Sequence, residues 1–292
     1  MIFEREIKSY MQPQTEAVIE SVFELPTELQ IMEEYYQNEI DFLNMVIEYK
    51  DALGSVNESY IESIHEGYME NLKKKAKEMI RRFIEFCNKI IIIIKEKIEA
   101  GKKVLLKKIQ KCKSEMVRLK DSSSKTTIII KNIKNEYLND TFKNFNDNYG
   151  ILSESLYKII RSLDTSDLDT NEIKNKINNL NIKNLDIEDY IFTEKTNKSF
   201  INGYLEDIDQ SIKLITNITD QHLKTLNNIK SEAAKLQNFI NKSNNKDLTN
   251  YLTCTNLIIS KIQSLYNSTV RNSTQYISTI NKILSDIESQ IK

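Results

Sequence analysis

The sequence predicts an all-α fold: an elongated helical bundle, coiled-coil-like in character, that ends in an antiparallel helical hairpin. The first reason is that the 292 residues include only five glycines and two prolines, whereas sheet proteins need these residues at their many turns. The second is that apolar residues recur every three or four positions over long stretches, which is the period of an amphipathic helix. A hydrophobic content of 40% and a charged content of 28% are typical of a folded globular protein.

Charge divides the N-terminal part of the chain in two. Residues 1–66 hold 15 acidic and 3 basic side chains, and residues 67–120 hold 17 basic and 6 acidic ones. The net charge therefore changes from −12 to +11, while the remaining residues balance at 21 of each sign. We take residues 1–120 as one predicted domain, in which an acidic arm and helices lead into a long basic amphipathic helix.

Three helical elements are expected in this domain. Residues 1–24 should form a short helix or arm, interrupted by Pro13. A second helix is expected over 28–54, because Thr27 and Gln30 form a capping box directly after a proline. From about residue 55 to residue 119 the apolar positions continue in steps of three and four, so we expect one long helix. A helix of that length needs partner helices alongside it.

The second predicted domain, residues 121–292, is rich in Asn and Ile. Asn occurs 5 times before residue 121 and 26 times after it, and the polar run 121–125 is the expected linker. A helix is expected over 126–163 and a polar connector over 164–198. Apolar stripes on both sides of a polar turn at 243–247 predict an antiparallel helical hairpin over 199–291.

No residue pattern predicts a catalytic, cofactor or metal site, so we expect a protein that is not an enzyme. The two histidines, His65 and His222, have no Cys or carboxylate at metal-ligand spacing. Each is expected at the surface or at the edge of the core. The three cysteines form no CxxC motif and are expected to pack inside the protein.

One stretch superficially begins a calcium-binding loop. Oxygen-bearing side chains stand at every second position in Asp167, Asp169 and Asn171. However, the sixth position of the loop is Glu172, where the turn requires glycine. Capping of a helix by Asp169 or Thr170 explains the same residues, and we expect no bound calcium.

The candidate interaction site is the basic face of the long helix. Because residues 28–66 are acidic, we expect them to pack against residues 67–120, within a chain or between copies. Apolar stripes would supply the stability and charge would select the partner. Nucleic acid or an anionic lipid surface is an alternative partner, since lysine suits phosphate contacts, and an acidic protein is a third. The residues of this face are Lys73, Lys74, Lys75, Lys77, Arg81, Arg82, Lys102, Lys103, Lys107 and Lys108.

The first 120 residues carry a family resemblance. An acidic helical start is followed by Glu66-Gly-Tyr-Met-Glu-Asn-Leu-Lys-Lys-Lys-Ala-Lys-Glu-Met-Ile-Arg-Arg-Phe-Ile-Glu-Phe. In style and in the order of its charges, this part resembles helical virion structural proteins of large tailed bacteriophages of low-GC hosts. The resemblance implies a non-enzymatic virion component, present in many copies and found in the host cytoplasm during assembly. It assigns no functional residue.

The leading hypothesis is a structural and interaction protein of a bacteriophage particle, which assembles through long helices with itself or with other structural proteins. One alternative is a secreted α-helical protein similar to pore-forming toxins. Another is a nucleic-acid or anionic-surface binder that uses the basic helix 73–113. The N-terminus lacks a basic stretch followed by an apolar one, so no signal peptide is expected. The longest apolar run, Ile90–Ile94, is too short for a transmembrane helix.

Overall fold

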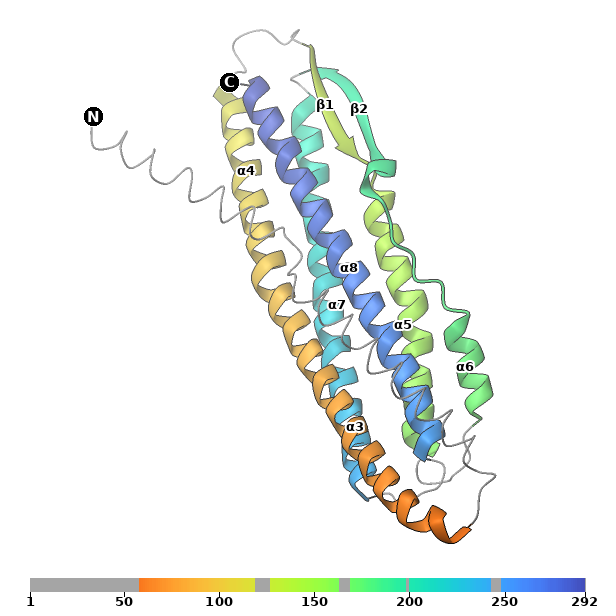
Figure 1. Cartoon of the computed structure of the whole chain (residues 1–292). Helices are drawn as coiled ribbons and strands as arrows, with labels where there is room; N and C mark the ends of the chain where they lie inside the picture. The colour runs from red at the N-terminus through yellow and green to blue at the C-terminus, as the bar shows by residue number, and fades with distance from the viewer. Residues whose placement is uncertain (1–57, 119–126, 163–168, 198–199, 243–247, 292) are drawn as a thin grey trace, which may run out of the picture.

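Helices dominate the computed structural model, which describes residues 58–118, 127–162, 169–197, 200–242 and 248–291 (Figure 1). The predicted all-α class is confirmed. The expected arm 1–24, helix 28–54, linker 121–125 and turn 243–247 lie outside the described residues. The elements are α3 (Glu58–Ile93), η1 (Ile94–Ile98), α4 (Glu99–Arg118), β1 (Thr127–Ile133), α5 (Glu136–Ser162), α6 (Thr170–Asn178), η3 (Ile187–Tyr190), β2 (Ile191–Asn197), α7 (Ile201–Lys242) and α8 (Leu248–Ile291).

The long basic helix expected over 55–119 is present as α3, η1 and α4, which follow one another without a break. Its core-facing stripe includes Phe83 on α3 and Leu105 on α4, both fully buried. η1 is a π turn, whose hydrogen-bonded ring is wider than that of an α-helix. Ile94 and Ile98, at the two ends of this turn, are both buried. The wide turn therefore keeps the apolar stripes of α3 and α4 on the core side of the helix.

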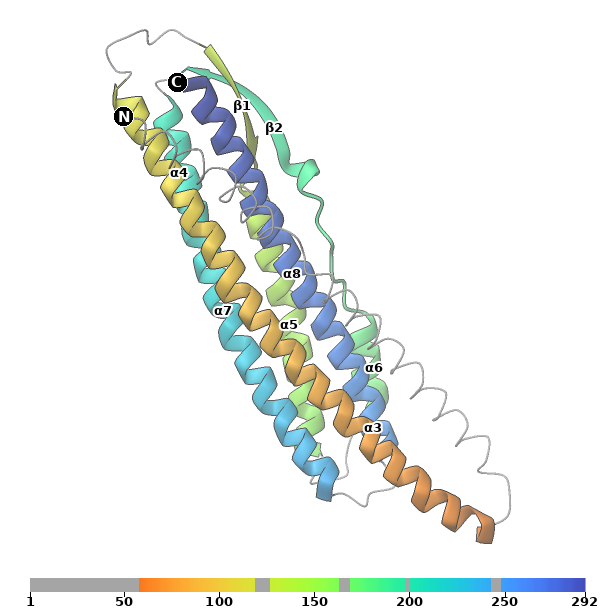
Figure 2. The same ribbon diagram turned by 60° about the vertical axis from the view of Figure 1, so that its left-hand side comes forward.

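The long helices run side by side along the molecule (Figures 1 and 2). α3 packs against α7, α4 packs against α8 and α7, and α5 packs against α8 and α7. α8 has little direct contact with α7, although the two helices are neighbours in the sequence. Most of its side chains are buried, because α4, α5, α6 and β1 pack around it. Both helices expected in the hairpin 199–291 exist, but each packs mainly against helices from elsewhere in the chain.

α8 buries polar side chains as well as apolar ones. The hydroxyls of Thr255, Thr269 and Thr274 donate hydrogen bonds to the backbone carbonyls four residues earlier, at 2.8, 2.8 and 2.9 Å. Such bonds within the helix satisfy a buried hydroxyl without any partner from another helix. A helix rich in Thr, Ser and Asn can therefore lie in the interior of the bundle.

Residues 127–133 form strand β1, so the prediction of a helix over 126–163 is wrong at its start. α5 begins only at Glu136. β1 pairs with β2 in an antiparallel arrangement that places Ile128 opposite Thr196. Ile128 and Ile130 are buried, whereas Ile129 between them is 53% exposed, which is the alternation of a strand. A run of β-branched residues favours this conformation over a helix.

The polar connector expected over 164–198 contains α6, η3 and β2. α6 follows Asp169, whose carboxylate accepts hydrogen bonds from the backbone N–H groups of Asn171 and Glu172. The predicted helix cap is thus confirmed. Farther along, Asn144 of α5 holds the extended segment between α6 and η3. Its amide donates to the carbonyl of Lys183 at 3.1 Å and accepts from the N–H of Lys183 at 3.2 Å.

The buried apolar residues form one continuous core. It includes Phe83 from α3, Leu105 from α4, Phe145 from α5 and Tyr266 from α8. The domain boundary expected at residue 121 therefore does not separate two cores. Instead, α3 and α4 are packed into the same bundle as the helices that follow.

Candidate interaction surface

The ten basic residues predicted to form one face differ widely in exposure. They lie on the helix that was expected, but their side chains project from different sides of it. Lys102 is buried, and the others are exposed or half-buried. Lys74, Arg81, Lys103 and Lys107 are exposed, and Lys73, Lys75, Lys77, Arg82 and Lys108 are half-buried.

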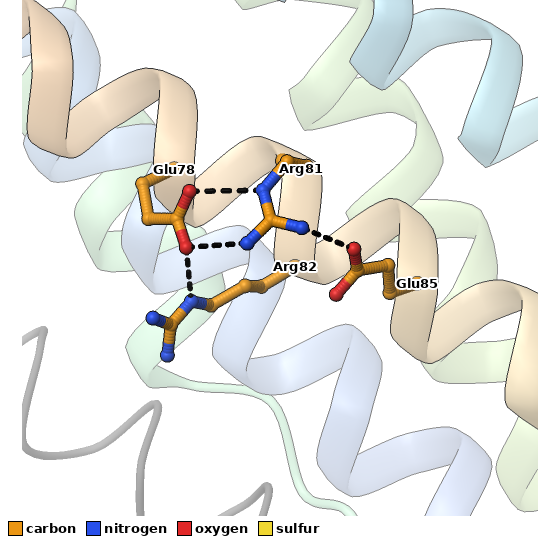
Figure 3. Close-up of polar contacts among 4 residues, drawn as sticks. All are labelled: Glu78, Arg81, Arg82 and Glu85. Carbon is orange, nitrogen blue, oxygen red and sulfur yellow. Dashed lines mark hydrogen bonds and ion pairs between the residues drawn. The ribbon is translucent and has the colours of Figure 1, made fainter.

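Arg81 and Arg82 are paired with carboxylates of their own helix (Figure 3). Arg81 donates two hydrogen bonds to Glu78, at 2.9 and 2.6 Å, and one to Glu85. Arg82 donates to the same Glu78 carboxylate at 2.7 Å. Hydrogen bonds from Arg81 and Arg82 lower the pKa of Glu78 to about 2. Local pairing therefore offsets much of the positive charge that this part of α3 presents.

Lys102 does not belong to a solvent-facing surface. Only 5% of the residue is exposed, and its ammonium group pairs with Glu99 one turn earlier. It also donates a hydrogen bond to the hydroxyl of Thr216 on α7, at 3.0 Å. Burial of an ammonium group requires such partners. Lys102 thus contributes to the packing of α4 on α7.

Two lysines of α4 bind side chains or carbonyls of α8. Lys108 donates to the hydroxyl of Ser285 at 2.6 Å and to the carbonyl of Asn281 at 3.4 Å. Lys111 forms an ion pair with Glu288, with 2.5 Å between the charged atoms. These contacts place part of the basic charge at the junction of α4 and α8. Residues 58–66 of the expected acidic partner belong to α3 itself, so in one chain they continue the basic helix. The pairing of residues 28–57 lies outside the described part of the chain and stays a prediction.

Exposed apolar side chains line the solvent side of the long helix. Ile92 is 50% exposed, Leu106 38% and Val117 65%. They are 14 and 11 residues apart, close to four and three helical turns at about 3.6 residues per turn. Exposed lysines lie between them. We call this surface the outer stripe: Ile92, Lys95, Lys103, Leu106, Lys107 and Val117.

The apolar members of the outer stripe are not among the residues predicted from the sequence to form an interaction site. Leu106 follows the core residue Leu105, and Ile92 belongs to the run Ile90–Ile94. In both places the sequence has more adjacent apolar residues than one side of a helix can bury. Adjacent apolar residues within a helical stripe are therefore the sequence feature from which an exposed apolar position could be predicted.

A second group of exposed apolar residues lies at one end of the bundle. Val117 near the end of α4, Ile129 of β1 and Phe200 next to α7 are 65%, 53% and 68% exposed. The C-terminal end of α4, the start of β1 and the start of α7 meet at this end (Figures 1 and 2). We call these three residues the tip cluster. Exposed lysines Lys131 and Lys195 belong to the same two-stranded sheet.

His222 lies in the core, deeper than the edge position expected from the sequence. It is 3% exposed and its ring centroid is 3.9 Å from that of Phe145 and 6.0 Å from that of Tyr266. Burial lowers the pKa of His222 to about 3. No described residue forms a hydrogen bond with its Nε2 atom. His65 lies in α3, in a part whose side chains the structure does not describe.

The cysteines are buried, as predicted, and all three are free thiols. Burial raises the pKa of Cys87 to about 12 and also raises the pKa values of Cys112 and Cys254, so all three favour the unreactive thiol form. Among the described residues, no three His, Cys, Asp or Glu side chains lie close enough together to bind a metal ion.

Two grooves border α5. One, of about 430 Å³, lies between α5 and residues 179–190 and is lined by Asp140, Asn144 and Asn148 among others. The other, of about 490 Å³, lies between α5 and α7 beside Gly150. Asn144 and Asn148 donate their amide hydrogens to backbone carbonyls of the connector. These amides therefore hold the connector in place instead of pointing freely into the groove.

Comparison of the chain with protein-family models, with curated proteins and with solved structures finds no match. Across the described helices, no stretch combines the length and the apolar character that crossing a bilayer requires. The surface chemistry of the bundle is therefore the basis for a functional proposal.

Proposed function

We propose that this chain is a non-enzymatic structural and interaction protein, a bacteriophage virion component that assembles with its own copies or with other structural proteins. The observation that supports this proposal is the outer stripe. It places large exposed apolar side chains, Leu106 and Val117 among them, in line with lysines on one long helix. Large apolar side chains with charged ones around them are the composition of protein-binding faces, which have an apolar core and a polar rim.

Burial of the outer stripe would supply the affinity of assembly. Fully burying an exposed leucine contributes about 1.5–3 kcal/mol. Leu106 is 38% exposed, so burying the rest of it would contribute about 1 kcal/mol. The lysines beside it would select an acidic partner surface. Because exposed charges are screened by salt, assembly should weaken as ionic strength rises, whereas the fold of the bundle should persist.

Sedimentation velocity across a range of protein concentrations tests the proposal. The expected result is a mass that rises above 34.2 kDa with concentration and falls again at high salt. Leu106→Gln should weaken assembly by about tenfold, because it loses this apolar burial and places an amide group in the contact. Ile151→Gln is the matched control, since Ile151 on α5 is also 38% exposed but lies away from the outer stripe. A compact monomer at every concentration would contradict the proposal.

A second candidate function is binding to an anionic membrane surface, in line with the pore-forming alternative. The tip cluster favours it, because exposed apolar residues beside lysines match the boundary between lipid headgroups and acyl chains. Binding to anionic vesicles, followed by dye release, would support this candidate. Phe200→Ser should then reduce binding, while Tyr157→Ser, which changes a 55% exposed residue of α5, should not. Absence of binding at micromolar protein would exclude it.

A further inference from the structure

We infer that the outer stripe of one copy binds the acidic segment 28–54 of a neighbouring copy. This inference rests on the proposed function, because it names the partner of the surface through which copies assemble. It specifies both sides of the contact. The acceptor runs from the end of α3 over η1 to α4, and the donor lies in the N-terminal region of the next molecule.

Charge and apolar pattern match across this contact. Residues 95–117 hold eight lysines and three glutamates, a net charge of +5, and Lys95, Lys103 and Lys107 of these lysines lie on the outer stripe. Residues 28–54 hold seven acidic side chains and one lysine, a net charge of −6. The segment also carries an apolar stripe at helical spacing, which includes Tyr35, Phe42 and Val46. These residues can bury Leu106 and Val117 while the acidic ones meet the lysines.

The reach of the chain favours a neighbouring copy over the same molecule. The segment 28–54 has 27 residues and spans about 40 Å as a helix. Folded back directly from residue 57, it would lie along α3 and end opposite about residue 85. Lys95 and Val117 are 37 and 59 residues beyond Glu58, which corresponds to about 55 and 88 Å along the helix. The predicted acidic helix therefore ends short of the outer stripe of its own chain.

The part of α3 within reach also offers less net positive charge, because residues 58–85 hold six basic and six acidic side chains. Arg81 and Arg82 already bind Glu78 and Glu85 on the same helix (Figure 3). By contrast, Lys95, Lys103 and Lys107 are exposed, and none of them forms an ion pair with the residues that the structure describes. The acidic segment therefore gains more charge pairing on α4 than on α3.

Donor and acceptor are different surfaces of one chain, so the contact is head-to-tail. Contacts of this kind close into rings if the rotation allows it and otherwise extend into filaments. Each added copy presents a new outer stripe and a new acidic segment, so assembly should continue beyond a dimer.

Charge reversal on each side tests the inference with full-length protein. The acceptor variant carries Lys95→Glu, Lys103→Glu and Lys107→Glu, and the donor variant carries Glu33→Lys, Glu34→Lys and Glu39→Lys. Each variant alone should sediment at 34.2 kDa. An equimolar mixture should assemble, because each reversed surface then meets its complement on the other chain. Lys213→Glu with Lys235→Glu, at exposed positions of α7, is the control and should assemble like the wild type.

The outcomes separate the two proposals. If the wild type assembles but the mixture stays monomeric, the acidic segment is not the partner, and the proposed function stands. The same holds if the donor variant assembles normally while the acceptor variant does not. A wild type that is monomeric at every concentration overturns both proposals. Circular dichroism of each variant establishes that loss of assembly is not loss of the helices.

Discussion

Protonation of His222 is expected to destabilise the bundle in mild acid. Its folded pKa of about 3 lies below the ordinary value of 6.5, so between these values the unfolded chain binds a proton that the folded chain does not. The folded state therefore has its full stability with respect to His222 above pH 6.5, and it loses stability as the pH falls toward 3. The free energy of unfolding should decrease by about 1.4 kcal/mol per pH unit across this window.

The slope between pH 6.5 and pH 5 measures this effect, since most carboxylates titrate at lower pH. Urea unfolding at several pH values should show the slope in the wild type and lose it in His222→Leu. His65→Gln, which removes the other histidine, is the control and should keep the slope. An unchanged pH dependence in His222→Leu would contradict the assignment.

The ion pair between Glu99 and Lys102 also makes a contribution to stability that can be measured. Glu99→Gln removes the carboxylate partner of a buried ammonium group and should destabilise the protein by about 1–3 kcal/mol. Lys102→Met removes the buried charge and keeps most of the packing, so it should cost less. Chemical denaturation of both variants tests this order. A larger loss for Lys102→Met would mean that the contact with Thr216 outweighs the cost of burying the charge.

At the scale of elements, the two faces of β1 should respond very differently to mutation. Ile130 is 3% exposed and Ile129 is 53% exposed. Ile130→Ala should lower the free energy of unfolding by about 2–4 kcal/mol, because it leaves a cavity against the helices. Ile129→Ala should change it by about 0.5 kcal/mol or less. Thermal unfolding of both variants distinguishes a strand from the expected helix. Adjacent side chains lie on opposite faces of a strand but only about 100° apart on a helix, so a helix would give a smaller difference between the two variants.

The long helices could be predicted from the sequence because their apolar residues repeat over many turns. α4 and α8, with Leu105, Ile109 and Ile280 among their buried residues, are examples. β1 could not, because Ile130 and Ile133 also fit a helical stripe and its partner β2 lies about sixty residues away in a polar segment. Pairing between distant segments leaves no local periodic signal.

The candidate site was only partly predictable for a similar reason. The stretch of lysines located the correct helix, but the direction of each side chain depends on which helices pack around it. Lys102 faces α7 through Thr216, whereas its neighbour Lys103 is exposed. One residue turns a side chain by about 100° around the helix, and a charge pattern alone does not give that direction.

The whole molecule should unfold as one unit, because α3 and α4 share a core with α5, α7 and α8. Leu105→Ala on α4 removes a fully buried side chain and should cost about 2–5 kcal/mol. The loss should appear equally in helix content and in the fluorescence of the buried tyrosines Tyr266 and Tyr276 on α8. Coincident transitions by both probes are the expected result. Two separate transitions would support independent domains on either side of residue 121.

The π turn at Ile94–Ile98 separates two parts of the long helix that pack against different neighbours. Upstream of it α3 follows α7, and downstream α4 follows α8 as well as α7. A π turn holds one residue more than an α-helical turn, so deleting one residue there would leave an ordinary α-helical turn with α4 in nearly its present orientation. By contrast, deleting one residue of α4 before Leu105 would rotate the side chains after it by about 100°. Leu105 would then turn out of the core, and the lysines after it would face different neighbours. This turn is thus the point at which the helix can accommodate a change in length while both halves keep their partners.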